Sequence, residues 1–132
     1  MAGNLKLNII TPEKEFYNGE IIELNTENDF GKLGILANHM PMITTLKPAV
    51  TTFKDAKGKT FTAFTSTGVL RVMENEIKIL CEACEWPEDI DIKRAEEAKK
   101  RAEERLNKKS SVDTQRAEIA LQRALLRLKI KG

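Results

Sequence analysis

The composition of the chain changes abruptly at Trp86-Pro87, and this boundary restricts the fold to two unlike parts. Before it, apolar residues recur at every second position, as in Leu5, Leu7 and Ile9. Such alternation is typical of strands with one buried face. After it, alanine and leucine recur at helical spacing among many charged residues. The sequence therefore predicts a β domain over residues 1–86 and a helical domain over residues 87–132.

Turn signals divide the β part at short intervals, which is typical of an antiparallel sandwich or barrel. They are Thr11-Pro12, Asn18-Gly19, Asn28-Asp29, Lys57-Gly58 and Glu74-Asn75. We predict an N-terminal antiparallel two-sheet β-sandwich. Residues 37–48 are expected to form an irregular connection, because Pro41 and Pro48 interrupt them. The 132 residues leave no room for a second enzyme-sized domain.

Two apolar stripes in the second part predict helices over about 91–106 and 112–130, joined by a short polar loop into an antiparallel hairpin. Asp89 or Asp91 is expected to cap the first helix, and Ser110 with Asp113 resembles a capping box for the second. Because alanine methyls bury little area, the seam is expected to be weak and able to open. The stripes are Ala95, Ala98, Ala102 and Leu106, then Ala117, Leu121, Ala124 and Leu128.

Charge is distributed unevenly between the two parts. Through Glu88 there are 9 basic and 12 acidic residues, about −3, whereas the remainder has 13 basic and 8 acidic, about +5. The asymmetry indicates that the helices meet an acidic surface or a phosphate. Arginine forks suit phosphate oxygens, and Asp91 is able to accept from an adenine amino group or simply to cap its helix. By spacing alone, a solvated charged face is the commoner meaning of such a pattern.

The basic residues fall on defined helical faces. On the second helix they form a stripe on the side opposite the apolar seam, and on the first they recur near Asp91, so that a hairpin brings arginines of both helices toward one polyanion. The stripe is Arg116, Arg123, Arg127 and Lys131, and the first helix contributes Arg94, Arg101 and Arg105.

The cysteine and histidine residues of the sequence do not favour a metal site or a redox site. Cys81 and Cys84 stand three apart at the end of a strand, where side chains are expected to point to opposite faces, so we interpret them as buried packing residues. With one histidine and no second cysteine pair, zinc lacks ligands and no metal site is predicted. Two cysteines cannot form the disulfide framework of a secreted domain, and a reducing compartment is expected.

Catalytic and nucleic-acid-binding functions are also disfavoured. His39 lacks a nucleophile or acid partner, and a hydrogen bond that fixes its loop is expected instead. Gly31-Lys32-Leu33-Gly34 lacks the ending of a phosphate loop and is interpreted as a turn. The chain after Glu88 has eight acidic residues and no aromatic residue for stacking on bases. Apolar runs are too short to cross a bilayer, so a soluble chain is expected.

Specific motifs then identify a family. Ile90-Asp91-Ile92-Lys93-Arg94-Ala95 resembles the I/L-D-x-x-R-A nucleotide motif of the epsilon subunit of bacterial F-type ATP synthases. Gly34-Ile35-Leu36-Ala37-Asn38-His39-Met40-Pro41 resembles the family's G-I-L-P-x-H-x-P signature. The segments 8–13 and 68–72 and the alanine-rich hairpin follow in family order, so the resemblance covers essentially the whole chain.

The resemblance implies a non-catalytic rotor component of the central stalk, which couples ion flow through the c-ring to ATP synthesis. The sandwich is expected to pack on the gamma subunit and to rest on the c-ring, with a docking loop that includes Gly34, His39 and Pro41. This would place the protein at the cytoplasmic face of the cell membrane, peripherally. The coupling ion, H⁺ or Na⁺, is determined in the c-ring and not here.

The resemblance further implies that the helices lie folded on the sandwich or extend into the alpha/beta hexamer. Extended, Arg116, Arg123 and Arg127 would meet an acidic segment of beta and inhibit ATP hydrolysis. Folded, the hairpin would bind regulatory ATP, with no obligatory cofactor. The alternative is a free-standing ATP-sensing module without a rotor partner. The implied ATP site comprises Glu85, Ile90, Asp91, Arg94, Ala95, Arg101, Arg105, Arg116 and Arg123.

Overall fold

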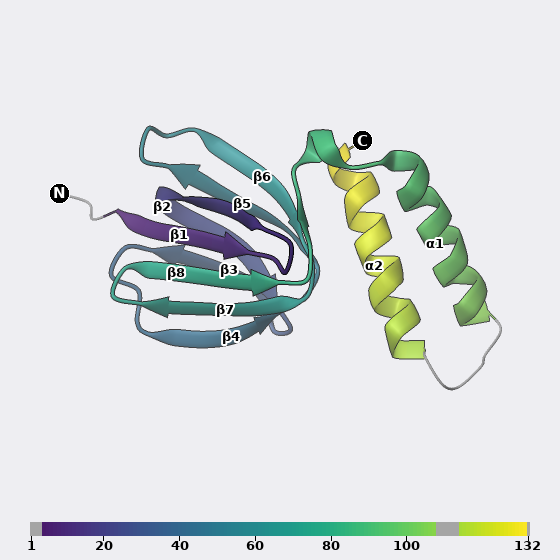
Figure 1. Ribbon diagram of the computed structural model, residues 1–132. Coiled ribbons are helices and arrows are strands. Elements are labelled where there is room, and N and C mark those ends of the chain that lie inside the picture. The colour runs from purple at the N-terminus through teal and green to yellow at the C-terminus, as the bar shows by residue number, and fades with distance from the viewer. Residues whose placement is uncertain (1–3, 108–113, 132) are drawn as a thin grey trace.

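The computed structural model describes residues 4–107 and 114–131, and it shows a β-sandwich followed by two helices (Figure 1). The predicted fold class is therefore confirmed. The strands are β1 (Leu5–Ile10), β2 (Glu15–Asn28), β3 (Gly31–Leu36), β4 (Met42–Leu46), β5 (Ala49–Asp55), β6 (Thr60–Thr65), β7 (Gly68–Met73), β8 (Glu76–Cys81) and β9 (Cys84–Glu85). The helices are the 3₁₀ turn η1 (Pro87–Asp89), α1 (Ile92–Asn107) and α2 (Thr114–Lys131).

The strands pair in the order β4-β7-β8-β1-β2-β5-β6-β9, with β3 beside β2. The long strand β2 joins the two layers, because its first half pairs with β1 and its second half with β3 and β5. Strand β1 is antiparallel to β2 but parallel to β8, a departure from the predicted antiparallel pairing. Apolar residues alternate in the same way in parallel and antiparallel strand pairs, so the sequence pattern does not distinguish the two kinds of pairing.

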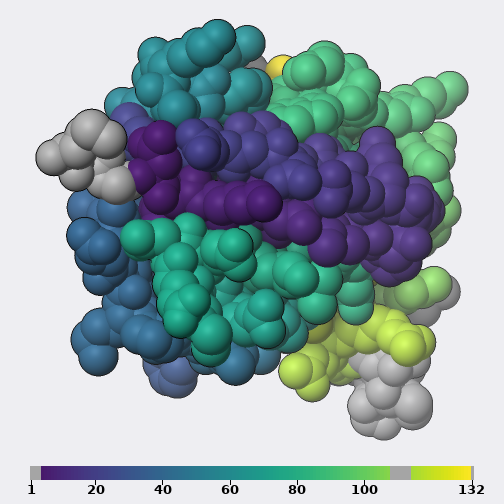
Figure 2. Space-filling model, turned by 60° about the vertical axis from the view of Figure 1, so that its left-hand side comes forward, coloured from purple at the N-terminus to yellow at the C-terminus, as the bar shows by residue number. Residues whose placement is uncertain are grey.

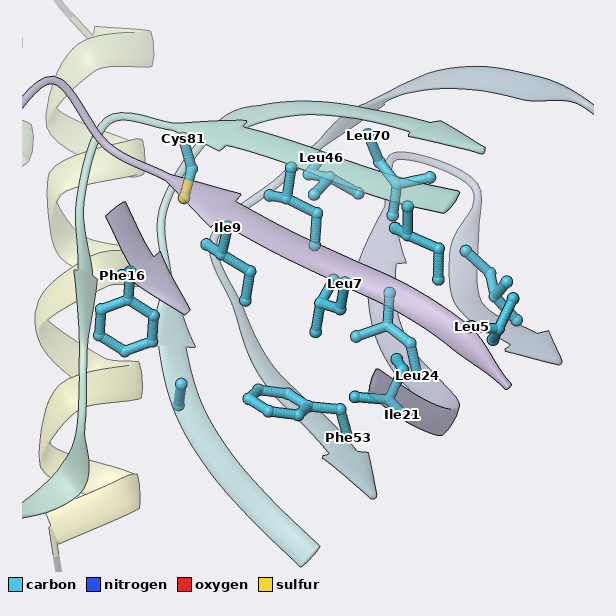
Figure 3. Packing of buried hydrophobic residues seen from close by; sticks show 14 of the residues in the cluster. Leu5, Leu7, Ile9, Phe16, Ile21, Leu24, Leu46, Phe53, Leu70 and Cys81 are labelled. Carbon is cyan, nitrogen blue, oxygen red and sulfur yellow. The ribbon is translucent and has the colours of Figure 1, made fainter. Parts of the chain in front are cut away.

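The core lies between the layers and is built from the inward side of each strand (Figure 3). Leu5, Leu7 and Ile9 are fully buried, as the alternation predicts. Each such side chain contributes about 2 kcal/mol by leaving water. At the junction with the helices, Trp86 stacks on Phe16 with ring centroids 4.4 Å apart. This contact fixes the end of the sandwich from which the helices depart.

Three local predictions are wrong. Asn18-Gly19 lies inside β2, where Gly19 pairs with Leu7 and leaves room for the Tyr17 ring; a Cβ there would stand 2.9 Å from the Tyr17 hydroxyl. The segment 31–34 belongs to β3, and the turn precedes it at residues 29–30. Residues 42–46 form β4 rather than an irregular connection, since pairing with β7 stabilises them.

The cysteines also depart from the prediction of opposite faces. Cys81 ends β8 opposite Gly68, whereas Cys84 begins β9 opposite Thr65, so the chain changes its pairing partner between them. This interruption turns both side chains the same way, and the sulfur atoms lie 2.7 Å apart. Both side chains are buried, as predicted.

The helices form an antiparallel pair at one end of the sandwich, and they leave the surface over β1 and β8 uncovered (Figures 1 and 2). Their seam is made of alanine: Ala95, Ala102, Ala117 and Ala124 are each at most 3% exposed. The proposed capping residues Ser110 and Asp113 lie outside the described residues. No helix in the described ranges is long and apolar enough to cross a membrane.

Candidate functional site

Helix α2 is held against the sandwich by ion pairs to the segment that follows β8. Arg123 Nη1 lies 3.4 Å from Glu82 Oε2, and Arg127 Nε donates to Glu85 Oε1. The predicted basic stripe therefore faces the acidic body of the same chain over these two positions, rather than solvent. Some of the excess positive charge of the helices is therefore paired with negative charge of the β part in the same molecule.

The row of contacts continues along α2. Lys131 Nζ donates to the main-chain carbonyl of Glu88 at 3.1 Å. The Arg127 guanidinium also lies over the Phe64 ring, 4.4 Å from its centroid, which adds a cation–π contact on a buried surface. Arg116 lies about two helical turns before Arg123, toward the start of α2, and is exposed. The docking contacts thus concentrate in the second half of α2.

A cavity of about 520 Å³ lies beside this row, between α1 and the sandwich. Four cationic side chains reach it from three separate segments. The β1–β2 turn supplies Lys14, α1 supplies Arg94 and Arg101, and α2 supplies Arg127. Its remaining lining includes Thr11, Glu13, Glu82, Ala83, Cys84, Glu85, Asp89, Asp91, Ala95 and Ala98. Guanidinium and ammonium groups bind anionic oxygens, but the same lining carries five carboxylates, so an anion would be held by individual cations and not by a net positive potential.

The start of α1 forms one wall of the cavity and is capped by Asp91. Asp91 Oδ1 accepts a hydrogen bond from the Arg94 amide at 3.1 Å, and its carbonyl accepts from the Ala95 amide at 3.0 Å. Of the two acids proposed as caps, Asp91 is the one used. A carboxylate has a second oxygen, so capping and accepting from a ligand are compatible. The positive end of the α1 helix dipole also lies at this wall.

The structure gathers only part of the predicted nucleotide site at the cavity. Glu85, Asp91, Arg94, Ala95 and Arg101 line it. The other predicted residues lie elsewhere: Ile90 is buried at 4% exposure, Arg105 and Arg116 are exposed, and Arg123 pairs with Glu82.

The predicted site omits nine of the residues that line the cavity, and three of them bear on its chemistry. Thr11 and Lys14 come from the β1–β2 turn, far from α1 along the chain, and no local pattern links them to it. Arg127 was assigned to contact with a beta subunit, and in this conformation it lines the cavity and pairs with Glu85. The sequence signal that could have placed Arg127 at the cavity was its position in the basic stripe of α2. Which way that stripe faces depends on how α2 docks.

The predicted docking loop lies at the other end of the sandwich (Figure 1). The Asn38 amide donates to Asn75 Oδ1 at 2.7 Å, which ties the loop to the β7–β8 turn, whereas β8 runs from this turn to the helix end. His39 Nδ1 donates to the Met40 carbonyl at 2.8 Å, the loop-fixing bond expected. Gly34 lies in β3 and Pro41 immediately precedes β4.

Metal ligands do not cluster in the part of the chain that the structure describes. No group of three or more His, Cys, Asp or Glu side chains is placed there to hold an ion. The cavity's chemistry is therefore that of charged side chains and a helix start.

Comparisons with known proteins agree with this architecture. Residues 4–87 match the β-sandwich domain of the ATP synthase delta/epsilon chain, and residues 88–132 match its long α-helix domain. The ATP synthase epsilon chain of Clostridium kluyveri (strain ATCC 8527) is 54% identical over 130 residues, which cover 98% of each chain. That of Clostridium botulinum (strain Okra) is 55% identical over 131 residues, covering 99% of this chain and 98% of the relative.

Solved structures share the fold at lower identity. A chain of the Euglena gracilis mitochondrial ATP synthase OSCP/F1/c-ring assembly superimposes with a TM-score of 0.79 at 19% identity, covering 90% of this chain and 76% of that one. A chain of the Tetrahymena thermophila mitochondrial ATP synthase central stalk and c-ring gives 0.68 at 13%, covering 99% and 98%. With both domains matched in order and relatives identical at more than half of the aligned positions, the chain belongs to the ATP synthase delta/epsilon chain family, among its epsilon chains.

Proposed function

We propose that this epsilon chain is a non-catalytic rotor subunit of the ATP synthase central stalk, and that α1 and α2 regulate ATP hydrolysis by leaving or rejoining the sandwich. The observation that carries this proposal is the row of contacts from α2 to Glu82, Glu85 and Glu88. A helix held by a few polar contacts and an alanine seam is able to detach at modest cost.

The sandwich is proposed to dock on the gamma subunit and the c-ring. Three large apolar side chains in or beside the docking loop support this part: Leu36, Met40 and Ile43 are 61%, 78% and 71% exposed. Apolar side chains gathered in this way on a surface are typical of interaction sites. Docking here would leave the opposite end, with its helices, free to move. The protein would then lie peripherally at the cytoplasmic face of the membrane.

The switch itself is an exchange of acidic partners. In the folded form Arg123 and Arg127 pair with Glu82 and Glu85. In the extended form the same arginines, with Arg116, would pair with an acidic segment of a beta subunit and block hydrolysis. The two states compete for the same cations, so their balance is sensitive to small differences in contact energy.

ATP is proposed to bind the cavity beside α1 and to favour the folded form. The cavity includes residues of both the sandwich and the helices, so a ligand there gains contacts that extension removes. A ligand shifts such an equilibrium only by its difference in affinity for the two states. Asp91, Arg94 and Arg101, with Lys14 and Arg127, are the residues we assign to this site.

The regulatory role is tested by adding the full chain, or a chain ending at Glu88, to the catalytic complex that lacks this subunit. The core cluster lies within residues 5–86, so the shorter chain keeps it. We expect both chains to bind through gamma, and only the full chain to suppress ATP hydrolysis. Equal suppression by both would contradict an inhibitory role of the helices, and failure of either to bind gamma would contradict the rotor role.

The ATP site is tested by calorimetric titration of Arg94→Ala. Loss of a guanidinium–phosphate contact removes about 1.5–3 kcal/mol, so affinity should fall by about tenfold or more. Arg105→Ala is the matched control, because it removes the same charge from the same helix at an exposed position away from the cavity. Equal weakening in both variants would indicate a general charge effect and contradict this placement.

A further inference from the structure

The paired cysteines between β8 and β9 have no part in the proposed switch, yet they are placed for chemistry with each other. Their sulfur atoms lie 2.7 Å apart, and both side chains are less than a tenth exposed. Figure 3 shows the Cys81 sulfur turned toward the core from the end of its strand. Closing to a disulfide requires a separation of about 2.05 Å, a small further approach.

The local backbone holds the two residues in this relation. The amide of Glu82 donates to the Thr67 carbonyl at 3.1 Å, and the amide of Ala83 donates to Ser66 Oγ at 2.8 Å. The intervening pair is thus pinned to the opposite corner of the sandwich. Both cysteines also border open space, since Cys84 lines the cavity beside α1 and Cys81 lines an apolar groove on the other side. A small reagent therefore has a route to the pair.

The two thiols also differ in acidity. The hydrogen bond between the sulfurs lowers the pKa of Cys81, against the opposing effect of burial. The same hydrogen bond and burial raise the pKa of Cys84. These opposite directions favour Cys81 over Cys84 as the thiol that loses its proton first. The thiolate is the reactive form.

We propose that Cys81 and Cys84 are a redox modification site, at which a hydroperoxide or a small disulfide converts the dithiol into an intramolecular disulfide. With a hydroperoxide, the Cys81 thiolate attacks the terminal oxygen, which gives a sulfenic acid and releases an alcohol. The Cys84 sulfur then displaces the hydroxyl as water and forms the S–S bond. The two thiols lose two hydrogens and two electrons in total, and the peroxide is reduced to alcohol and water.

The disulfide has a structural consequence for α2. It closes a ring over Glu82 and ends next to Glu85, the two carboxylates that hold Arg123 and Arg127. Restricting this segment reduces the entropy that it loses when the arginines pair with it. Oxidation is therefore expected to hold α2 more firmly on the sandwich. This inference rests on the contacts in the folded molecule and does not require that ATP binds.

The test treats the reduced full chain with tert-butyl hydroperoxide or with oxidised glutathione under native conditions. Intact mass should fall by two hydrogens, and the tryptic peptide Ile79–Lys93, which contains both cysteines, should resist alkylation until reduced. A stable glutathione adduct, a sulfinic acid, or two thiols that remain alkylatable would overturn the proposal. These readouts need no variant, so they do not depend on the folding of a mutant.

Variants and hydrogen exchange test the consequence. Cys81→Ala and Cys84→Ala each retain one thiol, and neither should lose two hydrogens with the same oxidant. In the oxidised wild-type chain, amides of α2 should exchange several-fold more slowly than in the reduced chain, and dithiothreitol should restore the faster rate. Unchanged exchange in α2 after complete disulfide formation would overturn the predicted hold on the helix.

Discussion

Gly68→Ala is expected to destabilise the sandwich by about 3 kcal/mol or more, enough to leave much of the chain unfolded near physiological temperature. A Cβ at this position would lie 2.3 Å from the Leu80 carbonyl oxygen and 2.8 Å from the Cys81 Cα. These are backbone atoms of the paired strand β8, which cannot rotate away. The β7–β8 register, which places Gly68 opposite Cys81, would have to shift.

The measurement is urea or thermal unfolding of the isolated chain, with Gly34→Ala as the matched control. Gly34 is also a strand glycine, but a Cβ there would meet only the Asn25 side-chain oxygen at 3.2 Å, and this group is able to move. We expect the control to lie within about 1 kcal/mol of the wild-type chain. Stability of Gly68→Ala close to that of the control would contradict the packing of β7 on β8.

The sandwich was predictable from sequence because its physical cause is local. Alternation in Leu5, Leu7 and Ile9 assigns one face of β1 to the core wherever its partners lie. The parallel pairing of β1 with β8 could not be predicted from sequence. These strands lie at opposite ends of the sandwich sequence, and only the tertiary fold brings them together. Strand β4 was missed for the same reason: prolines flank it, and its pairing with β7 supplies what its own sequence lacks.

In the candidate site, too, residues that are close in sequence were predicted and residues that tertiary folding brings in were not. Asp91 and Arg94 belong to one helix start, so their spacing alone placed them together, and both line the cavity. Lys14 reaches the cavity by tertiary folding, and Arg127 does so through the way in which α2 docks. The cysteines illustrate the limit most clearly. The rule that side chains three apart point to opposite faces holds within a strand, and Cys81 and Cys84 belong to two strands.

Glu85→Gln is expected to shift the helices toward the extended form and to strengthen inhibition of ATP hydrolysis. Its partner Arg127 serves both proposed states, whereas Glu85 serves only the folded one. The side chains of this pair are 30% and 24% exposed, and neutralising Glu85 beside a partly buried guanidinium costs the folded form about 1–2 kcal/mol. That corresponds to a shift of about 5- to 30-fold toward extension.

The neighbouring pair provides a graded comparison. Glu82 is 66% exposed where it meets Arg123, so Glu82→Gln is expected to cost less than about 1 kcal/mol. Glu88→Gln is the matched control, because Lys131 contacts the main-chain carbonyl of Glu88 and not its carboxylate. All three variants remove one negative charge from the same short segment. Their effects should therefore follow the contacts and not the net charge.

The reciprocal change distinguishes partner exchange from simple loosening. Arg127→Gln removes the cation from both states, so it weakens folding of the helices and also their hold on an acidic segment of beta. Hydrolysis by the assembled complex should then fall with Glu85→Gln, stay near wild type with Glu88→Gln, and rise with Arg127→Gln. If Glu85→Gln and Arg127→Gln changed hydrolysis in the same direction, Arg127 would act only in the folded form, and the exchange of acidic partners would be wrong. Faster hydrogen exchange in α2 of isolated Glu85→Gln, with hydrolysis unchanged, would show that release of the helix alone does not inhibit.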